Sequence, residues 1–132
     1  MHPKDAKADL NWIHALPGTK VMIRGNHDYW WASLKKLKKC CHLLFISFKI
    51  TFLKQMPSDA STRVVMTHCP PIGADLKDSR ISAILEKYKI SFCVFGHLHN
   101  IKHNTLHYGT KNHVKYVMCA CDYVDFNPVR LM

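Results

Sequence analysis

The sequence predicts an α/β fold built around a layered sheet. Short runs of aliphatic, β-branched and aromatic residues, which are typical of strands, alternate with longer segments whose apolar residues recur at helical spacing. The chain has 132 residues, 48% of them hydrophobic and 21% charged, which is an ordinary composition for a globular protein. Because this length suits one core, we expect residues 1–132 to form a single domain.

The predicted strands and helices follow one another along the chain. Five short apolar runs predict strands: Lys20–Arg24, Leu43–Phe52, Arg63–Thr67, Ser91–Phe95 and Val114–Cys121. Three apolar stripes at helical spacing predict helices: Pro3–Leu16, Tyr29–Cys41 and a helix that Asp78 caps and that runs to Tyr88. The buried side of this last helix is expected to carry Ile81, Ile84, Leu85 and Tyr88.

Composition and charge limit the classes of function. Lys and Arg number 19 against nine Asp and Glu, so the formal net charge is +10, which could attract a polyanion or be a basic surface without a partner. The segment from Tyr29 to Ser58 interleaves six lysines with aromatic residues, and a nucleic-acid-binding module is therefore a less favoured alternative; the same aromatics could form a core. No apolar run reaches the roughly 20 residues that span a bilayer, and no secretory signal is present, so we expect a cytoplasmic protein without membrane association.

Six cysteines, at positions 40, 41, 69, 93, 119 and 121, lack the spacing of a zinc ribbon. Without an oxidising compartment we expect buried free thiols rather than disulfides. Cys69 follows His68 and could form a nucleophilic pair with it, but no signature of an oxyanion hole accompanies the pair. The cysteines therefore do not carry the predicted function.

Metal-capable side chains follow three of the predicted strands, at the point where each strand ends. They are Asn26, His27 and Asp28 after the first strand, His68 after the third, and His97 and His99 after the fourth. Ligands in open α/β sheets gather beyond the carboxyl ends of the strands. The sequence therefore predicts a site at this edge of the sheet.

The segment after the first strand combines three kinds of chemistry. Asn26 offers a carbonyl oxygen to a divalent metal, His27 could donate a proton to a leaving group, and Asp28 could orient the imidazole of His27. An ordinary turn closed by an aspartate is the structural alternative. His68 is held by two following prolines and could be a rigidly placed ligand or a structural histidine.

The segment Gly96-His97-Leu98-His99 is the strongest of these signals. In an extended segment two imidazoles two residues apart point the same way, so they could serve one metal or each of a close pair. Neutral imidazole suits Zn, Mn or Fe. An exposed pair of histidines arising by chance is the alternative.

The ordered set Gly25-Asn26-His27-Asp28, then Thr67-His68-Cys69-Pro70-Pro71, then Gly96-His97-Leu98-His99 resembles the calcineurin-like metallophosphoesterase superfamily. The resemblance implies an αββα sandwich that holds two divalent metals and hydrolyses phosphate mono- or diesters with a metal-activated water. By this resemblance Asn26, His68 and His97 would bind one metal and His99 the other. His27 would act on the leaving oxygen, and Asp28 would hold His27.

The sequence departs from the family's pattern at two places. The family's Asp-x-His and Gly-Asp motifs, which supply the carboxylates of the metal centre, do not occur in this chain. We therefore expect an N-terminally truncated member, a partial αββα sandwich that lacks its first strands and part of the central sheet. Neutral ligands alone cannot offset the repulsion of two dications, so we expect one metal (Mn, Fe or Zn) at Asn26, His68 and His97. Such a chain would have weak or no activity alone, would pair with a complementing N-terminal fragment or with itself, or would be a non-catalytic metal-binding remnant.

Overall fold

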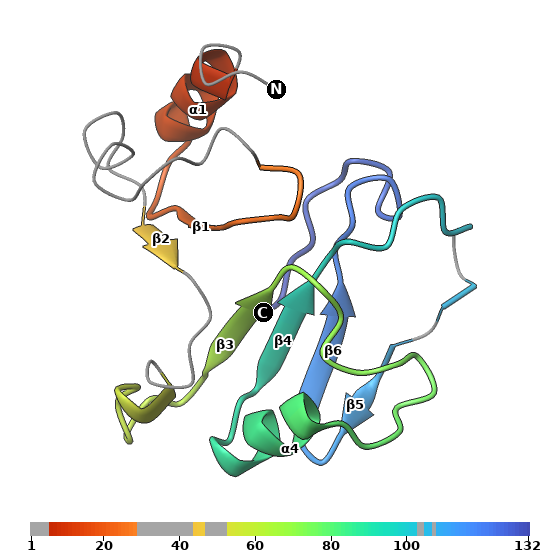
Figure 1. Ribbon diagram of the computed structural model, residues 1–132. Helices are drawn as coiled ribbons and strands as arrows, with labels where there is room; N and C mark the ends of the chain where they lie inside the picture. Colours follow the sequence, from red (N-terminus) through yellow and green to blue (C-terminus); the bar gives the residue numbers. More distant parts are fainter. Residues whose placement is uncertain (1–5, 29–43, 47–52, 103–104, 107) are drawn as a thin grey trace. The chain divides into compact units, whose positions relative to one another are not determined.

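The computed structural model describes residues 6–28, 44–46, 53–102, 105–106 and 108–132 (Figure 1). The chain forms two compact units, Met1–Ser47 and Phe48–Met132, and each is described by itself. The predicted helix Tyr29–Cys41 lies outside the described residues, as does most of the segment Tyr29–Ser58 on which the nucleic-acid alternative depends. No helix within the described ranges combines the length and the apolar content that a bilayer crossing needs.

Within its described residues, the first unit contains one helix and a pair of strands. Helix α1 (Ala6–Ala15) buries Ala6 and Leu10, with Ile13 and Met22 packed partly buried against them. Strand β1 (Val21–Ile23) pairs in parallel with β2 (Leu44–Ile46). The predicted helix Pro3–Leu16 and the predicted strand Lys20–Arg24 are confirmed as α1 and β1, and the described part of the predicted strand Leu43–Phe52 is β2.

The second unit contains a four-stranded sheet in the order β3-β4-β6-β5 (Figure 1). Strands β3 (Val64–Thr67), β4 (Phe92–Phe95) and β6 (Val114–Met118) are mutually parallel, and β5 (Thr110–Lys111) is antiparallel to β6. In this register Thr67 is opposite Phe95, and Phe95 is opposite Met118. The carboxyl ends of the three parallel strands are therefore level with one another.

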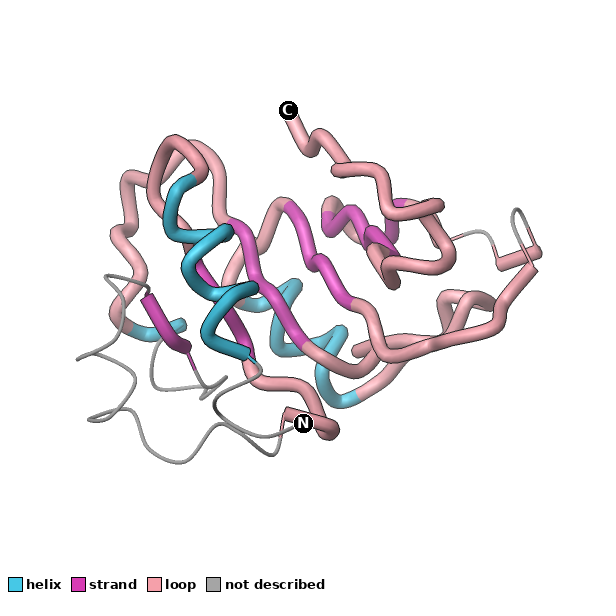
Figure 2. Tube along the Cα trace, turned by 90° about the horizontal axis from the view of Figure 1, so that it is seen from above, coloured by secondary structure: helices cyan, strands magenta, loops and turns pink. Residues whose placement is uncertain are grey.

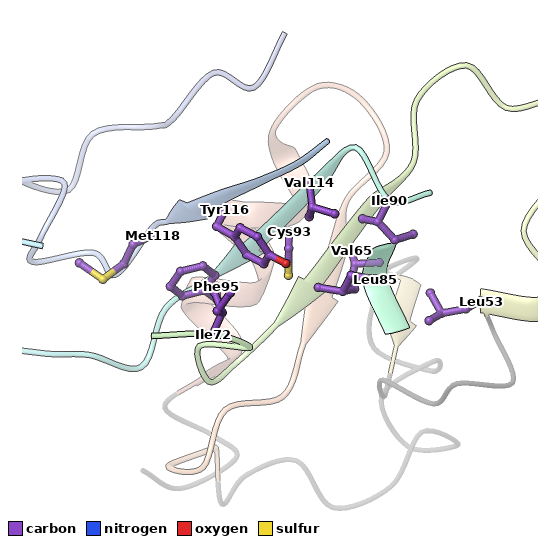
Figure 3. Close-up of a cluster of buried hydrophobic side chains, with 10 residues drawn as sticks. All are labelled: Leu53, Val65, Ile72, Leu85, Ile90, Cys93, Phe95, Val114, Tyr116 and Met118. Carbon is purple, nitrogen blue, oxygen red and sulfur yellow. The ribbon is translucent and has the colours of Figure 1, made fainter. Parts of the chain in front are cut away.

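The core of this unit covers one face of the sheet. Along β4 and β6 buried residues alternate with more exposed ones, as expected for strands with one face packed. The buried side chains of this cluster, drawn in Figure 3, are Leu53, Val65, Ile72, Leu85, Ile90, Cys93, Phe95, Val114, Tyr116 and Met118. The core residue of helix α4 (Arg80–Lys87) is Leu85, which is fully buried, while Ile81, Ile84 and Tyr88 pack partly buried around the cluster as predicted.

The start of α4 differs from the prediction. Ser79, not Asp78, is the N-cap: its hydroxyl accepts a hydrogen bond from the Ser82 amide at 2.9 Å, and the Ser82 hydroxyl accepts one from the Ser79 amide at 2.9 Å. The Ser79 hydroxyl also donates to the Pro71 carbonyl at 2.7 Å. Asp78 instead lies against the Lys111 ammonium. Asp78 and Ser79 are both good cap residues, and the contacts of the surrounding loop select between them.

The end of β6 also differs. The strand was expected to continue to Cys121 but ends at Met118, after which the chain turns: the amides of Tyr123 and Val124 both donate to the Ala120 carbonyl, at 2.9 and 3.1 Å. Beyond this point the chain runs to its C-terminus as turns and loop (Figure 2). The expectation of buried thiols is consequently wrong for Cys121, which is exposed, and for Cys69, which is exposed after β3; Cys93 alone of the described cysteines is buried.

The cap of α4 gives a first prediction. Ser79→Ala removes the hydroxyl that accepts a hydrogen bond from the Ser82 amide and donates one to the Pro71 carbonyl. The substitution should therefore lower the free energy of unfolding by about 1–2 kcal/mol. Asp78→Ala is the matched control, because an exposed ion pair contributes at most about 1 kcal/mol. Urea denaturation of both variants measures the difference. A larger loss in Asp78→Ala than in Ser79→Ala would contradict the assignment of the cap.

The buried thiol gives a second prediction. Burial raises the pKa of Cys93 to about 12, despite a hydrogen bond with the Thr67 side chain that lowers it, so the reactive thiolate is almost absent near pH 8. In native protein treated with iodoacetamide, Cys69 and Cys121 should be alkylated and Cys93 spared, as read by peptide mass spectrometry. Denatured protein, in which all three thiols must react, is the control. Alkylation of native Cys93 at the rate of Cys121 would show that this core opens readily.

Candidate metal centre

The side chains of His68 and His97 meet beyond the carboxyl ends of β3 and β4. His68 directly follows β3, and His97 follows β4 after one glycine. The Gly96 amide donates to the His68 carbonyl at 3.1 Å, which extends the pairing of the two strands by one residue. Two histidines 29 residues apart in the sequence are thereby brought into contact.

The geometry of this histidine pair suits metal ligation. Nδ1 of His97 and Nε2 of His68 lie 3.0 Å apart, and the rings are edge to face with centroids 4.8 Å apart. In the metal-free pair one nitrogen donates its proton to the other. Two nitrogens that bind one octahedral ion at about 2.1 Å, with an angle of about 90° at the ion, would also be about 3.0 Å apart, whereas a tetrahedral ion would need about 3.4 Å. The pair therefore fits a divalent ion once both protons reside on the opposite ring nitrogens.

The backbone of His97 has an unfavourable conformation. His97 has a φ of 70°, in the left-handed region that residues with side chains rarely adopt. The Leu98 amide donates to the Gly96 carbonyl at 2.9 Å, which closes a three-residue turn with His97 at its centre. Strain of this kind, about 1–3 kcal/mol, concentrates at functional sites.

This turn corrects the expectation that His97 and His99 share one direction. The segment is not extended at His97, and the two rings have different partners: His97 contacts His68, whereas Nδ1 of His99 lies 3.3 Å from Oδ1 of Asp122. The other carboxylate oxygen of Asp122 accepts a hydrogen bond from the Asn100 amide at 2.7 Å. That backbone hydrogen bond, with a smaller contribution from His99, lowers the pKa of Asp122, so the carboxylate stays charged.

Among the described residues of the second unit, two groups of potential metal ligands result. His68, Cys69 and His97 form one, and His99, Cys121 and Asp122 form the other; in each, one donor atom per residue lies within 4.8 Å of the others. The sequence analysis did not include Asp122 or Cys121 among the site residues. The signal that could have identified them is their place in the turn that follows β6, the strand that neighbours β4.

The predicted residues of the first unit form a turn of their own. The Gly25 amide donates to Oδ2 of Asp28 at 2.6 Å, and the Asp28 amide donates to the Gly25 carbonyl at 3.4 Å. Asp28 thus closes the turn that carries Asn26 and His27. Because the two units are described separately, the meeting of Asn26 and His27 with the histidines of the second unit stays a prediction.

One of three comparisons with known proteins found a match. A search of curated proteins and a search of solved structures gave no match. A family model described as calcineurin-like phosphoesterase matches residues 4–100, a range that includes the turn at Asn26 and the histidines at 68, 97 and 99. The match covers well over half of the chain, and the protein therefore belongs to the calcineurin-like phosphoesterase family.

Proposed function

We propose that this chain is a metal-dependent phosphoesterase domain whose metal is held by His68 and His97, with Asn26 as a third ligand. The observation that carries the proposal is the contact of the two imidazoles, 3.0 Å apart, at the level carboxyl ends of parallel strands. Family membership supports the reaction class, the hydrolysis of phosphate mono- or diesters. When bound, a divalent ion such as Mn, Fe or Zn would activate water and neutralise charge on the phosphoryl oxygens.

Different residues of the chain would bind the ion and transfer the proton. His68 and His97 would keep the ion at the open edge of the sheet, where a phosphoester can approach. His27 would deliver a proton to the leaving oxygen, and its place in a turn closed by Asp28 would fix the position of its ring. The net charge of +10 would draw an anionic ester toward the protein.

We further propose that the rate is low for this chain alone. The family's Asp-x-His and Gly-Asp carboxylates are absent from the 132 residues, and the two contacting histidines are neutral ligands. The two histidines therefore contribute no charge that would balance a second nearby dication. A segment of another protein chain that supplies these carboxylates would be expected to raise the rate. A metal-binding module without catalysis is the second candidate, favoured by the same missing carboxylates.

The test compares hydrolysis and metal content in one set of variants. His97→Ala should lower the Mn²⁺-dependent hydrolysis of bis(p-nitrophenyl) phosphate and the bound metal together, each by more than about tenfold, because loss of a ligand exceeds the effect of losing an outer partner. His113→Asn is the matched control: it removes an imidazole from a left-handed turn position that Asn tolerates, and should leave both unchanged.

The outcomes separate the two candidates. Metal bound in the wild type and lost in His97→Ala, without hydrolysis in either, would favour the non-catalytic module. Hydrolysis that is the same in His97→Ala as in the wild type would contradict the assigned centre. Metal analysis after dialysis, with Mn²⁺, Fe²⁺ and Zn²⁺ compared, gives the identity of the preferred ion.

A further inference from the structure

A second group of donor atoms lies outside the histidine pair. His99, Cys121 and Asp122 place one nitrogen, one sulfur and one oxygen atom within 4.8 Å of one another. His99 comes from the segment after β4, and the other two from the turn after β6. Three different donors, from segments more than twenty residues apart, converge on one place.

The backbone fixes both segments. The Cys119 amide donates to the Phe95 carbonyl at 2.7 Å, which joins the chain just beyond β6 to the end of β4. The Asn100 amide, at a left-handed residue with a φ of 57°, donates to Oδ2 of Asp122 at 2.7 Å. One carboxylate oxygen is thus occupied, while the other, Oδ1, faces His99 at 3.3 Å.

The side chains themselves remain accessible. The His99 and Asp122 side chains are 55% and 32% exposed, and Cys121 is also exposed. An ion can therefore reach the sulfur, and small rotations of exposed side chains would bring the donors to the separations of about 3.3–3.6 Å that a tetrahedral ion requires.

From this arrangement we propose that His99, Cys121 and Asp122 form a separate zinc site with an open fourth position. A thiolate is a soft ligand and, with imidazole and carboxylate, selects Zn²⁺ over Mg²⁺. On binding, a sulfur–zinc bond forms and the thiol proton passes to the buffer, so the group gains one thiolate without any oxidation. The proposal goes beyond the proposed function and does not rest on it, because the His68–His97 pair takes no part.

An exposed ion pair of His99 with Asp122 is the simpler interpretation. Such a pair contributes at most about 1 kcal/mol and requires no thiol. The two interpretations differ in what happens to Cys121 when zinc is added. In a zinc site the Cys121 thiolate is bound to the ion and reacts more slowly, whereas an ion pair of His99 with Asp122 leaves the reactivity of Cys121 unchanged.

The experiment measures alkylation of each cysteine in the full chain by peptide mass spectrometry. As Zn²⁺ is titrated, the labelling of Cys121 by iodoacetamide should slow, by about tenfold at ten times the dissociation constant. Equal concentrations of Mg²⁺ should give no protection. Release of protons in weakly buffered solution provides a second measurement of the same binding event.

Variants assign the protection to the three residues. His99→Ala and Asp122→Asn should shift the zinc titration of Cys121 to concentrations at least about tenfold higher. Asp125→Asn is the matched control, since it makes the same charge change in the same turn at an exposed residue whose left-handed backbone suits Asn. His68→Ala should leave the protection of Cys121 intact, which separates this site from the proposed catalytic metal.

Three results would overturn the proposal. Cys121 could label at one rate with and without Zn²⁺. Its protection could survive both His99→Ala and Asp122→Asn. It could also disappear in His68→Ala, in which case the thiol belongs to the other group. Each of these results leaves the hydrolysis test of His97 unaffected, so failure of the zinc site and failure of the proposed function are distinguishable.

Discussion

The register of β3, β4 and β6 is the constraint on which both groups of potential metal ligands depend. Because the strands are parallel and in step, Thr67, Phe95 and Met118 end level, and the residues that follow them leave the sheet side by side. Two backbone hydrogen bonds, from Gly96 to His68 and from Cys119 to Phe95, carry the pairing past the strands. These hydrogen bonds hold close together potential ligand side chains that are 23 to 29 residues apart in the sequence.

The packed face of the sheet supports the strain at this edge. His97 has a left-handed backbone only two residues after Phe95, whose side chain is 2% exposed. A conformation that costs about 1–3 kcal/mol persists only where its surroundings fix it. Here the fully buried Cys93 and Leu85 belong to the cluster that fixes β4. The core of the second unit thus fixes the carboxyl end of β4, which His97 follows.

Charge distinguishes the two groups of ligands. The His68–His97 pair contributes imidazoles, which leave the full charge of a bound dication to act on an anionic substrate. Each group also contains a cysteine, Cys69 in the first and Cys121 in the second, but only the group around His99 contains a carboxylate, whose pKa the Asn100 amide lowers. A cation would therefore be more fully neutralised at the second group than at the first.

The sequence by itself determined the α/β alternation, the places of the parallel strands and the family, because these follow from local apolar periodicity and from motifs read in order. The short antiparallel strand β5 was not predicted, and β6 ends earlier than predicted. It also placed His68 and His97 at strand ends. Only the tertiary structure decided that the turn at His97 sends His99 to a different partner, that Ser79 caps α4, and that Asp122 and Cys121 join His99. These three outcomes depend on backbone hydrogen bonds or packing between segments that are far apart in the sequence. Where two adjacent residues suit a position equally well, the local sequence does not show which of them these contacts favour.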